Sequence, residues 1–324
     1  MYKKSSTIHA VGLLLTGIFM AVAVSGCNLF SPQKKPDVTP PNPSVSLQAE
    51  PQISVYMHET GTTQSMMMED YIAGVVAGEM KSDWPVEALA AQAILARTFT
   101  IEAIETKGGV PERHTQASTD IKEFQAYSAK DITDNVKQAV AMTRGKIITY
   151  QGQPIHAWFH ASAGGMTATA KEGLDYKDAE PPYIMAVPSP DDLAPADIKS
   201  WTAKVKKQDI LAAMAKLGQT ASSLDSIEVT QKGPSGRVTQ FTVNKSIPVS
   251  GPELRVTVGG TLIKSMLLDK VEIVGDEVSF TGKGYGHGVG MSQWGAYSLA
   301  KSGKTANEII AQYFKDVTIE QRYQ

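Results

Sequence analysis

The chain has 324 residues, of which 31 are lysine or arginine and 33 are aspartate or glutamate, so its formal net charge is −2. This balance supplies no basic face for a polyanion, and we expect no nucleic acid partner. The single cysteine, Cys27, excludes a disulfide within the chain and a tetrahedral metal site built from several thiolates.

The first 26 residues have the pattern of a secretion signal. Two lysines precede an apolar stretch from Ala10 to Val24, which is shorter than the roughly 20 residues of a membrane-spanning helix. The run Val24-Ser-Gly-Cys27 resembles a bacterial lipobox, in which the cysteine becomes the lipid-bearing first residue of the mature chain. An uncleaved signal anchor with an incidental cysteine is the alternative. We expect a lipoprotein signal peptide over residues 1–26 and an anchor at Cys27 on the outer face of the cell membrane.

Residues 27–52 hold six prolines among serine, glutamine, lysine and asparagine. Such a segment buries too little apolar surface to fold, and we expect a linker that holds the folded part away from the membrane. Residues 53–324 have ordinary apolar content and are enough for one large domain. We expect an α+β fold there, with N-terminal helices packed on mainly antiparallel strands and an insertion around Asp191 to Leu217.

Apolar residues at three- and four-residue spacing predict a helix from Glu69 to Met80 with one buried face. Glu79 lies on or beside this apolar stripe. Because removal from water raises the pKa of a carboxyl group, Glu79 is a candidate for an acid that stays protonated near neutral pH and donates to a leaving group. A solvated residue near a frayed helix end is the other interpretation.

A second helix is predicted from Trp84 to about Glu105, with Pro85 in its first turn and an alanine-rich run after it. Its small residues allow close packing against the first helix. Arg97 projects from that face and needs a partner, since an unpaired buried guanidinium is costly. An ion pair with Glu79 would lower the pKa of that carboxyl group and oppose an acid role, so we expect Arg97 to orient substrate or backbone instead.

The segment after the second helix contains two histidines. Strands are predicted at Ile147 to Tyr150 and Ile155 to Phe159, joined by a turn at Gln151-Gly152, which places His160 at a strand end beside a loop of serine, alanine and glycine. His156 and His160 are four residues apart and could share a zinc ion. No third ligand lies near them in the sequence, so hydrogen-bonded histidines are the preferred interpretation, and we expect no metal or cofactor.

Every second residue from Gly282 to Gly290 is glycine. The alternation predicts an extended segment with one bare face, which a ligand or another backbone can approach closely. A phosphate-binding loop is disfavoured, because the dinucleotide spacing and a following βαβ unit are both missing; a purely structural glycine-rich corner stays open. A short amphipathic helix, about Ser292 to Lys301, is predicted next, with Gly303 as its C-cap.

Four segments of the chain, in order, resemble the stage II sporulation protein D family, which includes proteins described as amidase enhancers. They are Gly78-Glu-Met80 and residues 85–98, 159–165 and 284–296. The resemblance implies a lytic transglycosylase that acts on peptidoglycan glycan strands, particularly strands already stripped of stem peptides, with a glutamate matching Glu79 as the catalytic acid. By the same matching, with a weaker match at residues 183–189, the candidates that bind or orient the sugar are Arg97, His160, Tyr183, His287 and Gln293. Ser162, Tyr285 and Ser292 are further substrate-binding candidates, and the Tyr285 ring could stack on a sugar. Alanines flank Ser162 where a serine-rich loop is common in the family.

A single carboxyl group is enough for this reaction. An ordinary glycosidase needs two carboxylates, whereas in a lytic transglycosylase the 6-hydroxyl of muramic acid attacks its own anomeric carbon and leaves a 1,6-anhydro end. Glu79 would protonate the glycosidic oxygen and then take the proton of that hydroxyl. Two other functions stay open: a non-catalytic glycan-binding module that stimulates a cell-wall amidase, and a metal-dependent hydrolase that uses the histidines.

Overall fold

The computed structural model describes residues 48–324. The expected signal peptide, Cys27 and most of the expected linker lie outside the described residues. None of the helices between Gln48 and Gln324 combines the length and the apolar composition that a membrane crossing requires.

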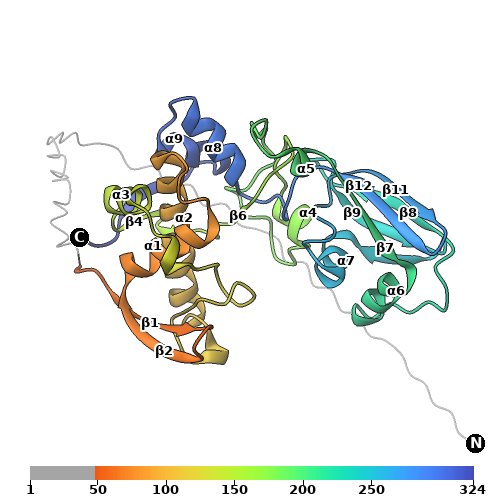
Figure 1. The fold of residues 1–324 in the computed structure, drawn as a ribbon, viewed down its shortest axis with the longest axis horizontal. Coiled ribbons are helices and arrows are strands. Elements are labelled where there is room, and N and C mark those ends of the chain that lie inside the picture. Colours follow the sequence, from red (N-terminus) through yellow and green to blue (C-terminus); the bar gives the residue numbers. More distant parts are fainter. Residues whose placement is uncertain (1–47) are drawn as a thin grey trace, which may run out of the picture. The chain divides into compact units, whose positions relative to one another are not determined.

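Helices and strands are mixed throughout the described residues, which confirms the α+β class (Figure 1). The α-helices are α1 (Met68–Glu79), α2 (Val86–Lys107), α3 (Asp134–Met142), α4 (Ala170–Leu174), α5 (Ala196–Lys199), α6 (Lys207–Lys216), α7 (Gly251–Val258), α8 (Gln293–Lys301) and α9 (Ala306–Tyr313). Two short 3-10 helices are η1 (Pro111–Arg113) and η2 (Ala129–Asp131). The strands are β1 (Gln52–Met57), β2 (Thr62–Met67), β3 (Ala117–Ser118), β4 (Lys146–Tyr150), β5 (Gln153–Pro154), β6 (Phe159–His160), β7 (Trp201–Lys206), β8 (Ile227–Lys232), β9 (Val238–Val243), β10 (Ile247–Ser250), β11 (Leu268–Val274), β12 (Glu277–Gly282), β13 (Met291–Ser292) and β14 (Thr318–Gln321).

The first of two hydrophobic cores is built around α2. The alanine-rich half of this helix is fully buried, and its small side chains let α1, α3, α8 and α9 pack closely on it. The predicted second helix is confirmed: Pro85 occupies its N-cap, and Gly108 ends it in the left-handed conformation, with φ of 73°. The predicted first helix is also confirmed, as α1.

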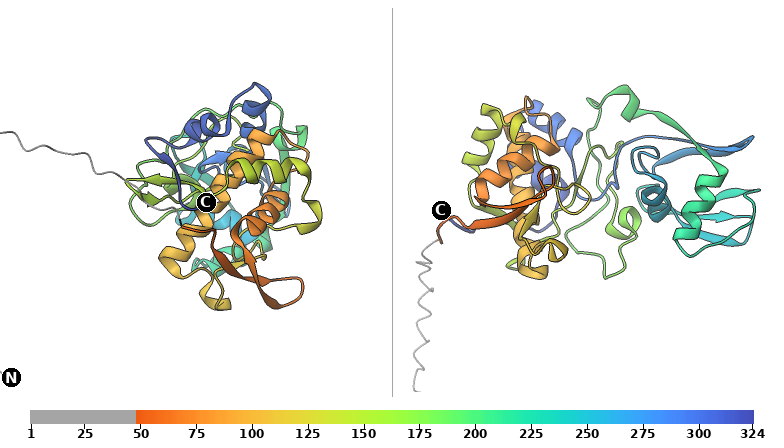
Figure 2. Two further views of the ribbon diagram at one scale, coloured as in Figure 1. Left: turned by 90° about the vertical axis from the view of Figure 1, so that its left-hand side faces the viewer. Right: turned by 60° about the horizontal axis from the view of Figure 1, so that its bottom comes forward.

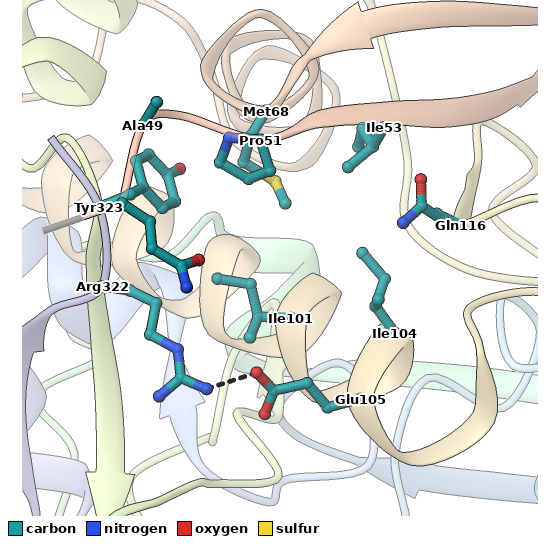
Figure 3. A pocket seen from close by; sticks show the side chains of 11 residues that line it. Ala49, Pro51, Ile53, Met68, Ile101, Ile104, Glu105, Gln116, Arg322 and Tyr323 are labelled. Carbon is teal, nitrogen blue, oxygen red and sulfur yellow. Dashed lines mark hydrogen bonds and ion pairs between the residues drawn. The ribbon is translucent and has the colours of Figure 1, made fainter.

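The two ends of the described chain meet at this first core. β14 pairs with β4 in antiparallel register, and Tyr323 forms a parallel bridge with Gln48 at the start of the described residues (Figure 2). A pocket of about 170 Å³ lies beside this junction, with apolar walls that include Ile53 and Ile101 and an ion pair between Arg322 and Glu105 at its edge (Figure 3). None of the predicted site residues lines this pocket.

The predicted hairpin after α3 is only partly confirmed. Its turn is present, because Gln151 and Gly152 both have positive φ and connect β4 to β5. The predicted second strand, Ile155 to Phe159, is wrong: β5 ends at Pro154, and after one further bond, from the Ile155 N–H to the Ile148 carbonyl, residues 156–158 leave the ladder. The next strand is β6, which pairs in parallel with β13 instead, so that His160 lies opposite Ser292.

A second hydrophobic core extends from Trp201 to Phe280. Two three-stranded antiparallel sheets, ordered β11-β12-β7 and β10-β9-β8, form it together with α6 and α7. This core continues well beyond Leu217, where the predicted insertion ends. Glu172 of α4, whose helix precedes this core, accepts hydrogen bonds from the backbone N–H groups of Ser235 and Arg237 at the start of β9.

Candidate active site

The C-terminal end of α1 lies against a loop formed by residues 125–128. Gly74 and Gly78 are four residues apart and so share one face of α1. The backbone N–H of Ser128 donates to the Gly74 carbonyl at 2.9 Å, and a Cβ atom at Gly78 would lie only 2.5 Å from the Tyr127 nitrogen. The two glycines therefore allow the loop backbone to approach the helix directly.

This close approach determines the surroundings of Glu79, the last residue of α1. The backbone N–H of Ala126 donates to Glu79 Oε1 at 2.8 Å. Burial raises the pKa of Glu79 to about 7, and hydrogen bonds from Ala126 and from the Gln293 side chain oppose part of that rise. Near neutral pH both the protonated and the ionised carboxyl group are therefore present.

Gln293 brings a second chain segment to this carboxyl group. It is the first residue of α8, and its amide lies within hydrogen-bonding reach of Glu79. The Gln293 Nε2 atom also donates to Gln92 Oε1 of α2 at 3.4 Å. The structure thus joins predicted site residues Glu79 and Gln293, together with Gln92, which sequence reasoning passed over as part of an alanine-rich helix.

Aromatic side chains surround the next residue of α8. The Trp294 ring packs against Trp84 with ring centroids 4.6 Å apart, and against Tyr297 at 5.3 Å. The ammonium group of Lys81 lies 5.8 Å from the Trp294 ring centroid. These three aromatic rings and the ammonium group form one cluster, which begins at the residue after Gln293.

Arg97 was predicted to orient substrate or backbone, and in the structure it bonds to Glu69 and to backbone carbonyls, so the substrate alternative is corrected. The Arg97 side chain is fully buried, and its Nε and Nη2 atoms donate to the two carboxyl oxygens of Glu69 at 3.0 and 2.5 Å. A further donor atom, Nη1, bonds to the carbonyls of Ala93 and Lys146. With no exposed surface, Arg97 has nothing to present to a sugar, and it is not paired with Glu79.

His160 and His287 lie side by side, with ring centroids 5.6 Å apart. Both serve the protein backbone: His160 Nδ1 contacts the Val289 carbonyl at 3.1 Å, and His287 Nδ1 accepts from the Val289 N–H at 3.0 Å. Burial, and to a smaller extent nearby arginines, lower the pKa of both imidazoles, that of His287 to about 3, so both rings are neutral near pH 7. They hold the glycine-rich segment in place.

Ser162 and Ser292 meet at a carboxylate that sequence reasoning missed. Asp191 is buried and accepts from Ser162 Oγ at 2.6 Å, from Ser292 Oγ at 3.0 Å and from the Gly164 N–H at 3.0 Å. The predicted sugar-binding hydroxyls are thus engaged within the protein. Asp191 carried no sequence signal beyond its place at the edge of a predicted insertion. Its role is to fix the start of α8, where Ser292 caps the helix by accepting from the Gly295 N–H.

The glycine run departs from its prediction of a strand with a bare face. Gly284, Gly286, Gly288 and Gly290 all have positive φ, a conformation that a strand does not contain and that glycine adopts readily. Their Cα atoms face protein groups: a Cβ atom at Gly288 would lie 2.5 Å from the Arg237 guanidinium, and one at Gly290 would overlap the Trp158 carbonyl. The close approach that the glycines allow is made by the protein itself.

The remaining predicted residues lie in separate surroundings. Tyr183 is buried and its hydroxyl accepts from the His156 N–H at 3.0 Å, whereas the backbone of Tyr285 pairs with that of Ser162. The His156 ring contacts Glu102 and Tyr176, at 3.2 and 3.3 Å. Over residues 48–324, no three histidine, cysteine, aspartate or glutamate side chains are grouped so that they could hold a metal ion.

Comparisons with known proteins identify relatives over most of the chain. A family model described as stage II sporulation protein matches residues 56–150, and one described as a domain of unknown function (DUF8618) matches residues 192–290. The chain is 31% identical to stage II sporulation protein D of Bacillus amyloliquefaciens, over 83% of this chain and 78% of the relative. It is also 31% identical to stage II sporulation protein D of Bacillus subtilis (strain 168), over 85% and 81% respectively. An amidase enhancer of the same Bacillus subtilis strain is 29% identical over 76% of this chain and 40% of the relative.

Proposed function

Because the chain belongs to the stage II sporulation protein D family, we propose that it is a lytic transglycosylase that cleaves peptidoglycan glycan strands and leaves 1,6-anhydromuramic ends. One observation carries this proposal: the half-buried Glu79 carboxyl group accepts from the Ala126 N–H, and burial raises its pKa to about 7. A general acid is most effective when its pKa lies near the working pH.

In the proposed reaction Glu79 acts twice. Its carboxyl group first gives a proton to the glycosidic oxygen as the bond from that oxygen to the anomeric carbon breaks. The 6-hydroxyl oxygen of the same muramic acid forms the new bond to the anomeric carbon, and its proton passes to the Glu79 carboxylate. The carboxyl group ends the cycle protonated, so that no second carboxylate and no water are consumed.

Gln293 and the loop residue Ala126 support the ionised stage of this cycle. The Ala126 N–H donates to Glu79 Oε1, and the nearby Gln293 amide also lowers the pKa of the Glu79 carboxyl group, because donors of this kind stabilise a carboxylate more than a carboxylic acid. They limit the rise in the pKa of Glu79 that burial causes, which keeps the group able to release its proton. Of the eight predicted sugar-binding residues, Gln293 is therefore the one that we place beside the reacting atoms.

We extend the proposal to the location of the protein. Residues 53–324 would form the catalytic domain, and Cys27 would carry a lipid that anchors the protein to the outer face of the cell membrane through the proline-rich linker. The substrate would then be the cell wall outside that membrane. A chain that keeps its radioactive palmitate label after a Cys27→Ser change would contradict the anchor.

A second candidate function follows from the name of one relative, an amidase enhancer. In that case the protein would bind glycan strands and stimulate a separate cell-wall amidase, and Glu79 would only bond to sugar. The two functions differ in their products, because binding alone creates no new glycan ends.

The test incubates the purified full-length protein with glycan strands freed of stem peptides and examines the products by mass spectrometry. We expect anhydromuramic ends with the native protein and none with Glu79→Gln. The matched control is Glu112→Gln, the same change at an exposed carboxylate of η1, which should leave the products unchanged. Strand binding without new ends would favour the enhancer, and ends that disappear on chelation would favour a metal-dependent hydrolase.

A further inference from the structure

Gln92 is a polar residue in a place that favours an apolar one. It lies in the middle of α2, fully buried, and the residues before and after it are alanines that are also fully buried. Its Nε2 atom has no hydrogen-bond partner in the protein. A buried amide donor without an acceptor costs stability, so an apolar side chain of similar size would suit the packing better.

The other end of the Gln92 amide has one partner. Gln92 Oε1 accepts from Gln293 Nε2 at 3.4 Å, and the Gln293 side chain is itself almost fully buried. The Gln293 amide group carries two hydrogens on Nε2, and its other neighbour is the Glu79 carboxyl group. One nitrogen can therefore serve both Gln92 and Glu79.

We propose that Gln92 is a positioning residue of the Glu79 site, whose amide oxygen fixes the orientation of the Gln293 amide so that Nε2 faces the carboxyl group of Glu79. The proposal rests on the proposed function, because it assigns Gln92 to that reaction. If Gln293 turned its amide over, its oxygen would face the Glu79 carboxylate, and two acceptors would then repel each other. The Gln92 oxygen opposes this rotation, because it would also lose its donor.

The position of Gln92 suits this task. α2 is the central helix of the first core, and it contacts α1, which carries Glu79, and α8, which carries Gln293. A side chain fixed in the middle of that helix has little freedom to follow movements of Gln293. With Oε1 directed at Gln293, the Gln92 Nε2 atom is left without a hydrogen bond. Buried polar groups without a hydrogen-bond partner are often found at functional sites.

The experiment measures the titration of Glu79 directly. Glutamate carboxyl carbons are labelled with carbon-13 in the full-length protein, and the Glu79 signal is identified by its loss in Glu79→Gln. Tyr71 and Tyr127 are titratable groups packed near Glu79, and burial raises the pKa of both hydroxyls above their ordinary value, so a transition near pH 7 reports Glu79. Gln92→Met and Gln293→Met are compared with Ile94→Val, a change in the fully buried part of the same helix.

We expect Gln92→Met to raise the pKa of Glu79, as Gln293→Met does, and the double variant to show no further rise. Cleavage by Gln92→Met should fall roughly tenfold or more, since misplacing a reacting group by about 1 Å can cost about a hundredfold. The melting temperature should stay level or rise, whereas Ile94→Val should lower it and leave the pKa of Glu79 unchanged.

Two results would overturn the proposal. One is a Glu79 titration in Gln92→Met that matches the native protein; the other is a pKa change in the double variant equal to the sum of the two single changes. Because the titration needs no substrate, either result is independent of whether the native protein forms anhydromuramic ends. If the proposed function itself is wrong, the native protein will form no anhydromuramic ends.

Discussion

The Glu79 carboxyl group gives the proposed reaction a defined pH dependence. As the acid in the first step, it must be protonated in the free protein, and its pKa is raised to about 7. We therefore expect kcat/KM on denuded strands to fall as the pH rises through about 7. The measurement is the initial rate of formation of anhydromuramic ends between about pH 5 and 9. Activity that begins to fall near the ordinary glutamate pKa, or that stays constant to about pH 9, would contradict this role.

The same carboxyl group should make folding stability depend on pH. Its pKa rises from 4.5 to about 7 on folding, so between these values the folded protein holds a proton that the unfolded chain has lost. Stability therefore falls as the pH rises through this window. Replacing Glu79 with glutamine removes the cost, and we expect the free energy of unfolding to increase by about 1–3 kcal/mol at about pH 8 and to change little at about pH 4. Urea unfolding followed by circular dichroism measures both values. Equal effects of Glu79→Gln at the two pH values would show that the carboxyl group is not desolvated.

The placement of Arg97 predicts a loss of stability and not of chemistry. Lysine at this position keeps the positive charge, but its single ammonium nitrogen cannot donate to both oxygens of Glu69 in the way that the planar guanidinium does. Breaking a buried ion pair typically costs about 3–5 kcal/mol, so we expect Arg97→Lys to cost about 2 kcal/mol or more. Thermal unfolding measures it. The control Arg113→Lys alters an exposed pair with Glu123 and should cost less than about 1 kcal/mol. A fall in kcat of folded Arg97→Lys with unchanged stability would instead support a role in substrate orientation.

At the scale of elements, the contact between α1 and the loop of residues 125–128 depends on two glycines. A Cβ atom at Gly74 would overlap the Tyr127 ring, and one at Gly78 would meet the Tyr127 backbone. We expect Gly74→Ala and Gly78→Ala each to destabilise the protein by about 1–3 kcal/mol and to reduce cleavage, since the loop carries the Ala126 donor to Glu79. Adding Tyr127→Ala should restore loop contact in Gly74→Ala but not in Gly78→Ala, because only the first clash involves a side chain. If Tyr127→Ala restored stability in both glycine variants, or in neither, the placement of the Tyr127 ring against Gly74 and of the Tyr127 backbone against Gly78 would be contradicted.

Elements with strong local signals were predictable from the sequence. Apolar spacing, Pro85 and the alanine-rich run determine α1 and α2, and helical periodicity predicts Glu79 on or beside the apolar stripe, where the structure leaves it half-buried. The segment from Gly282 to Gly290 was not predictable in the same way. Alternating glycines suit a bare strand as well as a chain of left-handed residues, and the choice between them depends on His160, Arg237 and the Trp158 backbone, which pack against the glycines.

At the scale of the whole molecule, the candidate site depends on contacts between segments far apart in the sequence. Glu79, Gln92 and Gln293 come from α1, α2 and α8, and the Asp191 carboxylate fixes the start of α8 from a loop that precedes the second core. Helical spacing indicated Glu79 and the family resemblance indicated Gln293, but neither gave a reason to select Gln92 or Asp191. Their partners are known only once the chain is folded, because neither residue lies in a local pattern that demands a polar side chain.

The central claim is that one carboxyl group, Glu79, cleaves glycan strands without using water. Digestion of denuded strands in heavy-oxygen water, followed by mass spectrometry of the new ends, tests it most directly. The account predicts anhydromuramic ends that contain no heavy oxygen and that are absent with Glu79→Gln. New reducing ends that carry heavy oxygen, or unchanged cleavage by Glu79→Gln, would contradict it.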